Sequence, residues 1–260
     1  MTAPGREADD RRTSTPRTHP VGPTLMTVGA VCAIGTVIAF VVGIVFMAAS
    51  GVQVLIPPTG KDGLNWIRDV DEAGGAFFVG AWLLILGGVL GIPTLLGFYE
   101  ALRRVRSWFI LAPILSAVGL TLVTISHLIP IAMAYELVPG YTAAETATKA
   151  SLATMADTFA VLALVINYAG DVLLWGIAVP MYAIAVLKTS VLPRWIGWLG
   201  VGVGVFAGLG DALSPASSVI EGVTCFGFVA FCVWTAAMGV ALLRRKSQAA
   251  PPGSVAKPAA

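Results

Sequence analysis

Long apolar runs separated by short polar stretches form the dominant pattern of this chain. Each run is close to the roughly 20 apolar residues that a helix needs to cross a bilayer. The runs cover residues 25–49, 77–99, 108–134, 159–187, 195–212 and 219–243, and the fifth is the shortest. The pattern predicts an all-α polytopic membrane protein with six transmembrane helices over residues 25–243. The polar ends, 1–24 and 244–260, are predicted to be disordered tails.

Two of the connections are tight. Residues 103–107 and 188–194 are short enough to make spans two and three, and spans four and five, antiparallel neighbours. Tryptophans stand where these connections enter the next span, and indole prefers the headgroup region of a bilayer. They are Trp108, Trp195 and Trp198.

The two longer connections are predicted to contain helix. The first, residues 53–75, carries apolar side chains on one helical side, which predicts a short helix lying in the membrane interface. These side chains are Leu64, Trp66, Ile67 and Val70. The second, residues 136–157, begins with Pro139-Gly140 and is then rich in alanine and threonine. We expect that part to extend the fourth span outward as helix.

Composition supports the membrane class. Of the 260 residues, 57% are hydrophobic and 12% are charged, and the mean hydropathy is +0.86. A soluble domain usually has about 25% charged residues. All three cysteines, Cys32, Cys225 and Cys232, lie inside apolar runs. An extracytoplasmic disulfide framework is therefore not expected.

The basic residues predict the orientation. With the N-terminus inside, 13 of the 16 lysines and arginines lie on the cytoplasmic side, and Lys61, Arg68 and Lys149 lie outside. The positive-inside rule then selects an N-in, C-in topology. Acidic residues gather at the outer boundary, which would attract cations, but the favoured interpretation is simply that loops are polar.

Asp171 is the main candidate for chemistry because it lies inside the fourth span. It is about 12 residues from the outer end of that span, or roughly 18 Å, hence near the midplane. Asn167 lies one turn outward on the same helical side, and His127 of the third span is predicted at the same depth as Asn167. Asp171 and His127 could meet directly or through a water molecule.

Two interpretations of these residues remain open. A carboxyl group in hydrocarbon must be protonated, paired or in contact with water, and an Asp–His pair would suit a proton relay or a cation site. The same pair could be polar glue between helices, typically worth about 0.6 kcal/mol. No second intramembrane acid and no intramembrane lysine or arginine accompanies Asp171.

Other chemistry has little support, and no cofactor is predicted. His127 is the single intramembrane histidine, which does not suit haem or a metal site, and no HExxH or CxxC motif occurs. Ser126 and His127 are adjacent, but neighbouring side chains diverge on a helix, so a nucleophile–base pair is not expected there. No catalytic residue is predicted.

Glycines at a spacing of four residues predict close helix packing on the fifth span. They are Gly200, Gly204 and Gly208. The fourth span is the favoured partner because the short linker holds it nearby, and another subunit is the alternative. Prolines within spans, Pro93, Pro130 and Pro180, are expected to kink them. The expected partners are the lipid bilayer and either a second copy or another membrane protein, and no nucleic acid.

Two segments resemble a known family. Residues 97–104, Gly-Phe-Tyr-Glu-Ala-Leu-Arg-Arg, and residues 192–200, Leu-Pro-Arg-Trp-Ile-Gly-Trp-Leu-Gly, are similar to the bacterial six-span membrane family catalogued as domain of unknown function 4386. The likeness covers about residues 25–243, and the long polar N-terminal tail departs from it. The resemblance implies a multi-pass protein of the bacterial inner (cytoplasmic) membrane and carries no established activity.

Three hypotheses for function follow. The first is a non-enzymatic structural or partner-binding membrane component. The second is a small proton-linked carrier or permease that uses Asp171, Asn167 and His127. The third is an enzyme acting on lipid near the outer acids Asp69, Asp71 and Glu72.

Overall fold

The computed structural model describes residues 24–52, 62–105, 107–189, 191–213 and 218–249. The described part is almost entirely helical and contains no strand. The all-α prediction is therefore confirmed. The predicted tails fall almost wholly on residues 1–23 and 250–260, outside the described residues, except that the last helix continues past Leu243 to Ala249.

The helices follow one another with short connections. In chain order they are α1 (Leu25–Ser50), α2 (Asp62–Ala73), α3 (Gly75–Leu102), η1 (Ser107–Ile110), α4 (Leu111–Ala143), α5 (Thr146–Asp171), η2 (Val172–Ala178), α6 (Val179–Lys188), α7 (Arg194–Val203), η3 (Gly204–Leu209), α8 (Gly210–Leu213) and α9 (Ser218–Ala249). Here η1 is a 3-10 turn, whereas η2 and η3 are π-helical. The helix from α5 through η2 to α6 is continuous over 43 residues.

Five helical stretches in the described part are long and apolar enough to cross a membrane. They are Leu25–Ser50, Gly75–Leu102, Ser107–Ala143, Thr146–Lys188 and Phe226–Arg245. A shorter apolar helix, Arg194–Leu209, matches the fifth predicted span. A multi-pass membrane protein is the architecture that these lengths and compositions support.

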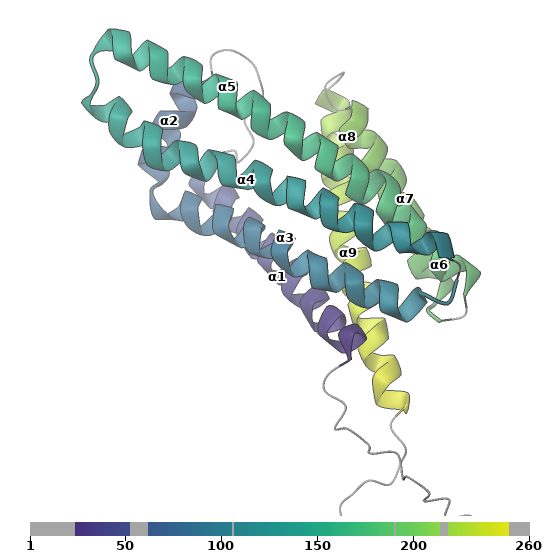
Figure 1. Cartoon of the computed structure of the whole chain (residues 1–260). Coiled ribbons are helices and arrows are strands. Elements are labelled where there is room, and N and C mark those ends of the chain that lie inside the picture. Colours follow the sequence, from purple (N-terminus) through teal and green to yellow (C-terminus); the bar gives the residue numbers. More distant parts are fainter. Residues whose placement is uncertain (1–23, 53–61, 106, 190, 214–217, 250–260) are drawn as a thin grey trace, which may run out of the picture.

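The apolar helices close into a ring. Neighbours around it are α1, α3, α4, the α5–η2–α6 helix, the α7–η3 helix and α9, which returns to α1. Figure 1 shows α4 and α5 as a long antiparallel pair, with the beginning of α1 and the end of α9 toward one end of the bundle and α2 toward the other. The ring brings segments far apart in sequence around one shared core.

Aromatic side chains fill the middle of the ring. Tyr182 of α6 is fully buried and donates its hydroxyl to the Leu95 carbonyl at 2.8 Å. The Phe109 ring meets Tyr182 edge-on at 5.4 Å, and Phe98 meets Trp234 edge-on at 5.7 Å. These contacts join α3, η1, α6 and α9 into one of the two buried clusters of the described part.

Glycine pairs set the closest crossings of the ring. A Cβ atom built on Gly29 of α1 would lie 2.5 Å from Cα of Gly97 on α3. One built on Gly119 of α4 would lie 2.7 Å from the carbonyl oxygen of Gly170 on α5. Because hydrocarbon provides no hydrophobic drive between helices, such backbone contacts supply much of the packing energy.

The amphipathic helix α2 packs on protein. Its apolar face is buried, with Trp66 4%, Ile67 0% and Val70 2% exposed, in a cluster that also includes Phe77 of α3 and Ala156 of α5. The prediction of a helix at this place is correct, and the structure adds that its apolar face packs on protein. The ends of α3, α4 and α5 offer that face a better-packed surface than lipid headgroups.

The second long connection is more helical than expected. Helix α4 runs through Pro139 to Ala143, so Pro139-Gly140 lies inside a helix and does not begin a loop. Helix α5 starts at Thr146, in agreement with the predicted outward extension of the fourth span. The third and fourth predicted spans therefore form one tall hairpin with a two-residue turn.

The start of α2 is held by a carboxylate from α5. Oδ1 of Asp157 accepts a hydrogen bond from the Gly63 amide at 3.0 Å, as an N-cap side chain would. We expect Asp157→Ala to cost about 1 kcal/mol and to increase hydrogen exchange in α2 while α1 and α9 stay protected. Asp157→Asn keeps the acceptor oxygen and should behave like the wild type. Equal exchange in both variants would contradict this role.

Candidate functional site

Asp171 is the last residue of α5 and is buried, with 3% of its surface exposed. The backbone contact between Gly119 and Gly170 lies beside it and brings α4 and α5 very close together. Short side chains can therefore meet across this crossing. Ser126 of α4 is 0% exposed and Asn167 of α5 is 8% exposed.

A chain of hydrogen bonds joins four polar side chains at this crossing. Nδ2 of Asn167 donates to Oδ2 of Asp171, one turn away on α5. The Ser126 hydroxyl lies 3.0 Å from Oδ1 of Asn167 and 3.2 Å from Nδ1 of His127. The predicted pairing of Asp171 with His127 is thus indirect in this structure, because Ser126 and Asn167 lie between them.

The expectation that Ser126 and His127 diverge is wrong at the level of their polar atoms. Both side chains turn back toward the carbonyl of Val123, which Ser126 approaches at 2.7 Å and His127 Nδ1 also at 2.7 Å. A carbonyl only accepts, so Nδ1 of His127 carries the hydrogen of that contact. The shared acceptor draws the two neighbouring groups together. The direction of the Cα–Cβ bonds of neighbouring residues is therefore not enough to predict how close their polar atoms come.

The direction of donation along these hydrogen bonds can reverse. The one hydrogen of the Ser126 hydroxyl can go either to Asn167 or to the Val123 carbonyl. With Asp171 ionised, Ser126 donates to Asn167, and the Asn167 amide donates to Asp171. With Asp171 protonated and the amide turned over, the acid donates to Asn167, Asn167 donates to Ser126, and Ser126 donates to Val123. Both protonation states leave these groups paired.

A π-helix begins directly after Asp171. In η2 the Val179 amide donates to the Leu174 carbonyl, five residues back. Pro180 follows, and because it has no amide hydrogen and its ring crowds the carbonyl four residues earlier, a wider turn relieves the clash. The irregularity that the structure shows before Pro180 is thus a π segment, and the predicted kink stays a prediction. Such segments often mark functional positions in helices.

The glycine stripe of the fifth span packs against this π-helix. Gly204 lies under the ring of Pro180, and a methyl group on Gly208 would overlap the backbone of Gly176. Gly200 lies against Ala183 and the indole nitrogen of Trp234, which a Cβ atom there would approach to 2.7 Å. The three glycines thus contact the η2–α6 helix, which belongs to the predicted fourth span, and α9 of the same chain.

Some buried polar atoms in the described part have no hydrogen-bond partner. They are Nε1 of Trp175, Nε1 of Trp234 and Oγ1 of Thr235. Trp175 lies on η2, one turn after Asp171, and its ring contacts Phe231 of α9 at 5.8 Å. The unpaired indole N–H of Trp175 therefore leaves a free hydrogen-bond donor on the π-helix η2.

The other sequence candidates lie apart from this chain. Asp69 and Glu72 of α2 border a shallow hollow of about 470 Å³ with Ser50 and Gly51, and Asp71 is exposed on the same helix. Cys32 and Cys232 are free thiols, and the side chain of Cys225 is outside the described set. Within the described residues, no group of three or more His, Cys, Asp or Glu side chains could hold a metal ion.

Comparison with known proteins gives one family. The family model described as "Domain of unknown function (DUF4386)" matches residues 28–245 of the chain. No curated protein and no solved structure matches. The matched range contains all four residues of the hydrogen-bonded chain and both π-helical segments.

Proposed function

The chain belongs to the family of domain of unknown function 4386, and we propose that it is a non-enzymatic carrier of the bacterial cytoplasmic membrane that couples proton binding at Asp171 to solute movement. The reversible chain of hydrogen bonds from Asp171 to Ser126 carries this proposal. It offers a buried proton site that stays satisfied in two states.

A six-span, N-in, C-in arrangement is part of the proposal. The continuous helix from α7 through η3 to α8 is about 30 Å long at 1.5 Å per residue, which matches the hydrocarbon thickness of a bilayer. The beginning of α1 and the end of α9 lie toward the same end of the bundle in Figure 1. The distribution of lysine and arginine favours the cytoplasm for that end.

The surroundings of Asp171 suit a moving part. The π-helix η2 and its partner η3 meet through Gly176 and Gly208, so little side-chain interdigitation opposes sliding there. When the direction of these hydrogen bonds reverses, Ser126 of α4 changes from donor to acceptor toward Asn167 of α5. A proton on Asp171 can therefore bias the α4–α5 contact, while η2 and η3 adjust.

Solute-dependent proton movement tests the carrier. Purified protein is reconstituted in vesicles that contain a pH-sensitive dye, a pH gradient is imposed, and amino acids, sugars, inorganic cations and organic cations are added in turn. We expect at least one solute class to accelerate proton movement with the wild type and none to do so with Asp171→Asn. Asp157→Asn, an acid change at the outer end of the same helix, should leave the acceleration intact.

A structural or partner-binding role is the second candidate. The chain of hydrogen bonds also joins α4 to α5, and such bonds hold transmembrane helices together. If the wild type and Asp171→Asn give the same proton traces with every solute, the carrier proposal is wrong and this role replaces it. Co-purification of a stable membrane partner with both proteins would then be the expected finding.

A further inference from the structure

An apolar groove runs along the lipid-facing side of the bundle between α7 and α9. Its volume is about 800 Å³. One face of α9 forms the first wall, with residues spaced by three or four positions: Val233, Ala236, Ala237, Val240, Ala241 and Arg244. The opposite wall includes Leu192, Trp195 and Ile196. Val233 and Trp195 are 51% and 56% exposed, so the groove is open to the surrounding bilayer.

The groove has the length of one lipid leaflet. From Val233 to Arg244 the helix rises about 17 Å, whereas half of the hydrocarbon core is about 15 Å. Three alanines on α9 leave a channel between the bulkier residues at its edges. A single extended acyl chain has the shape and polarity to fill such a channel, and hydrocarbon chains of the bilayer are always present beside it.

Two arginines stand at one end of the groove. Arg245 donates from Nη1 to the Val191 carbonyl at 3.1 Å, which holds its guanidinium near the groove mouth. Arg244 lines the groove directly, and no ion pair of either arginine occurs within the described residues. Unneutralised guanidinium groups at the end of an apolar channel match a phosphate headgroup.

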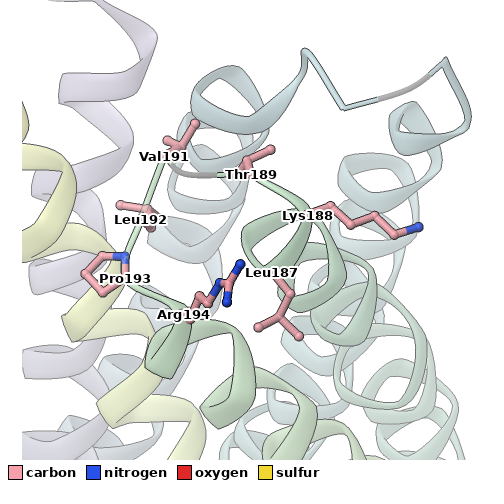
Figure 2. A pocket seen from close by; sticks show the side chains of 7 residues that line it. All are labelled: Leu187, Lys188, Thr189, Val191, Leu192, Pro193 and Arg194. Carbon is pink, nitrogen blue, oxygen red and sulfur yellow. The ribbon is translucent and has the colours of Figure 1, made fainter.

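The linker between α6 and α7 adds further positive charge beside the groove. Val191, Leu192 and Pro193 border both the groove and a second hollow of about 550 Å³. Figure 2 shows this second hollow, with the guanidinium of Arg194 beside Leu187 and the amine of Lys188 extending away from the linker. The groove mouth therefore lies in a basic region.

We propose that the groove between α7 and α9 is a binding site for one anionic phospholipid, with an acyl chain along α9 and the phosphate at Arg244 and Arg245. Basic pockets beside transmembrane helices recognise anionic headgroups in this way. The site is separate from Asp171 and does not depend on the proposed carrier function. If it is correct, the basic end of the bundle binds anionic phospholipids in preference to neutral ones.

Lipid binding to the full-length protein in detergent tests the proposal. Dissociation constants for dioleoylphosphatidylglycerol and dioleoylphosphatidylcholine are measured by native mass spectrometry. We expect the wild type to prefer phosphatidylglycerol. Because each arginine near an anionic headgroup contributes about a fivefold affinity, the double variant R244Q/R245Q should bind phosphatidylglycerol on the order of 25-fold more weakly. Both arginines are exposed, so the fold should be kept.

Two further variants separate a built site from general charge. R103Q/R104Q removes two exposed arginines from the linker between α3 and α4, away from the groove, and should leave the preference unchanged. Val240→Trp fills the groove at an exposed position and should weaken binding of both lipids. The proposal is overturned if R103Q/R104Q weakens binding as much as R244Q/R245Q, or if Val240→Trp has no effect on either lipid.

Discussion

Replacement of Gly208 by alanine lowers the melting temperature of the purified protein by several degrees. The added methyl group would overlap the backbone of Gly176 and lie 2.9 Å from the carbonyl carbon of Trp175. Backbone atoms cannot rotate aside as a side chain can, so η2 and η3 must separate. Overpacking of this kind costs about 1–3 kcal/mol, and each kcal/mol corresponds to about 2–4 °C in a protein of this size.

Two neighbouring glycines provide matched controls. A Cβ atom on Gly176 would lie 3.6 Å from Cα of Gly208, an ordinary contact, and one on Gly202 meets nothing within 4 Å. Alanine at either position should therefore be neutral or slightly stabilising, because alanine favours helix over glycine by about 1 kcal/mol. Thermal unfolding of the three variants in detergent checks the ranking. Loss of stability in Gly176→Ala equal to that in Gly208→Ala would show that the crossing is arranged differently.

The second large effect is expected at Asp171. Asp171→Asn retains an oxygen that can accept from Asn167 and removes a carboxylate whose burial in a membrane costs about 2.5 kcal/mol or more. We expect this variant to melt at or above the wild-type temperature while solute-dependent proton movement is lost. A stable and inactive variant is the signature of a residue kept for function.

Asp171→Leu separates the hydrogen bond from the charge. Leucine leaves the buried Asn167 amide without this acceptor. The Asp171→Leu variant should therefore be less stable than Asp171→Asn by about 0.6–2 kcal/mol and melt at a lower temperature. Differential scanning fluorimetry in one detergent compares all three proteins. If Asp171→Asn unfolds as readily as Asp171→Leu, the carboxylate itself holds the helices, and its role is structural.

The length and apolar composition of the runs were sufficient to predict the spanning helices. The six runs correspond to α1, α3, α4, the α5–η2–α6 helix, the α7–η3 helix and α9. The packing partner of α2 was not predictable, because an amphipathic pattern shows that one face is buried and does not distinguish lipid headgroups from protein. The sequence predicts a connection at Pro139, whereas α4 continues through it.

The candidate site was predictable in its residues and not in its connectivity. Asp171 and Asn167 are visible as polar positions in an apolar run, one turn apart, and the structure joins them by a hydrogen bond. The role of Ser126 depends on the close crossing at Gly119 and Gly170, which no periodicity reveals. The π-helix η2 was likewise beyond sequence reasoning. Only Pro180 gave a local reason to expect an irregular turn.

The continuous helix from Thr146 to Lys188 has a mechanical consequence. At 43 residues it is about 65 Å long, roughly twice the hydrocarbon thickness, so one rod joins the α2 layer to the basic linker at Lys188. A twist applied to this rod at its α2 end would either turn Asp171 about the helix axis or be taken up in the wider turns of η2. The wider turns of the π-helix therefore lie between the two ends of the rod, directly after the buried Asp171.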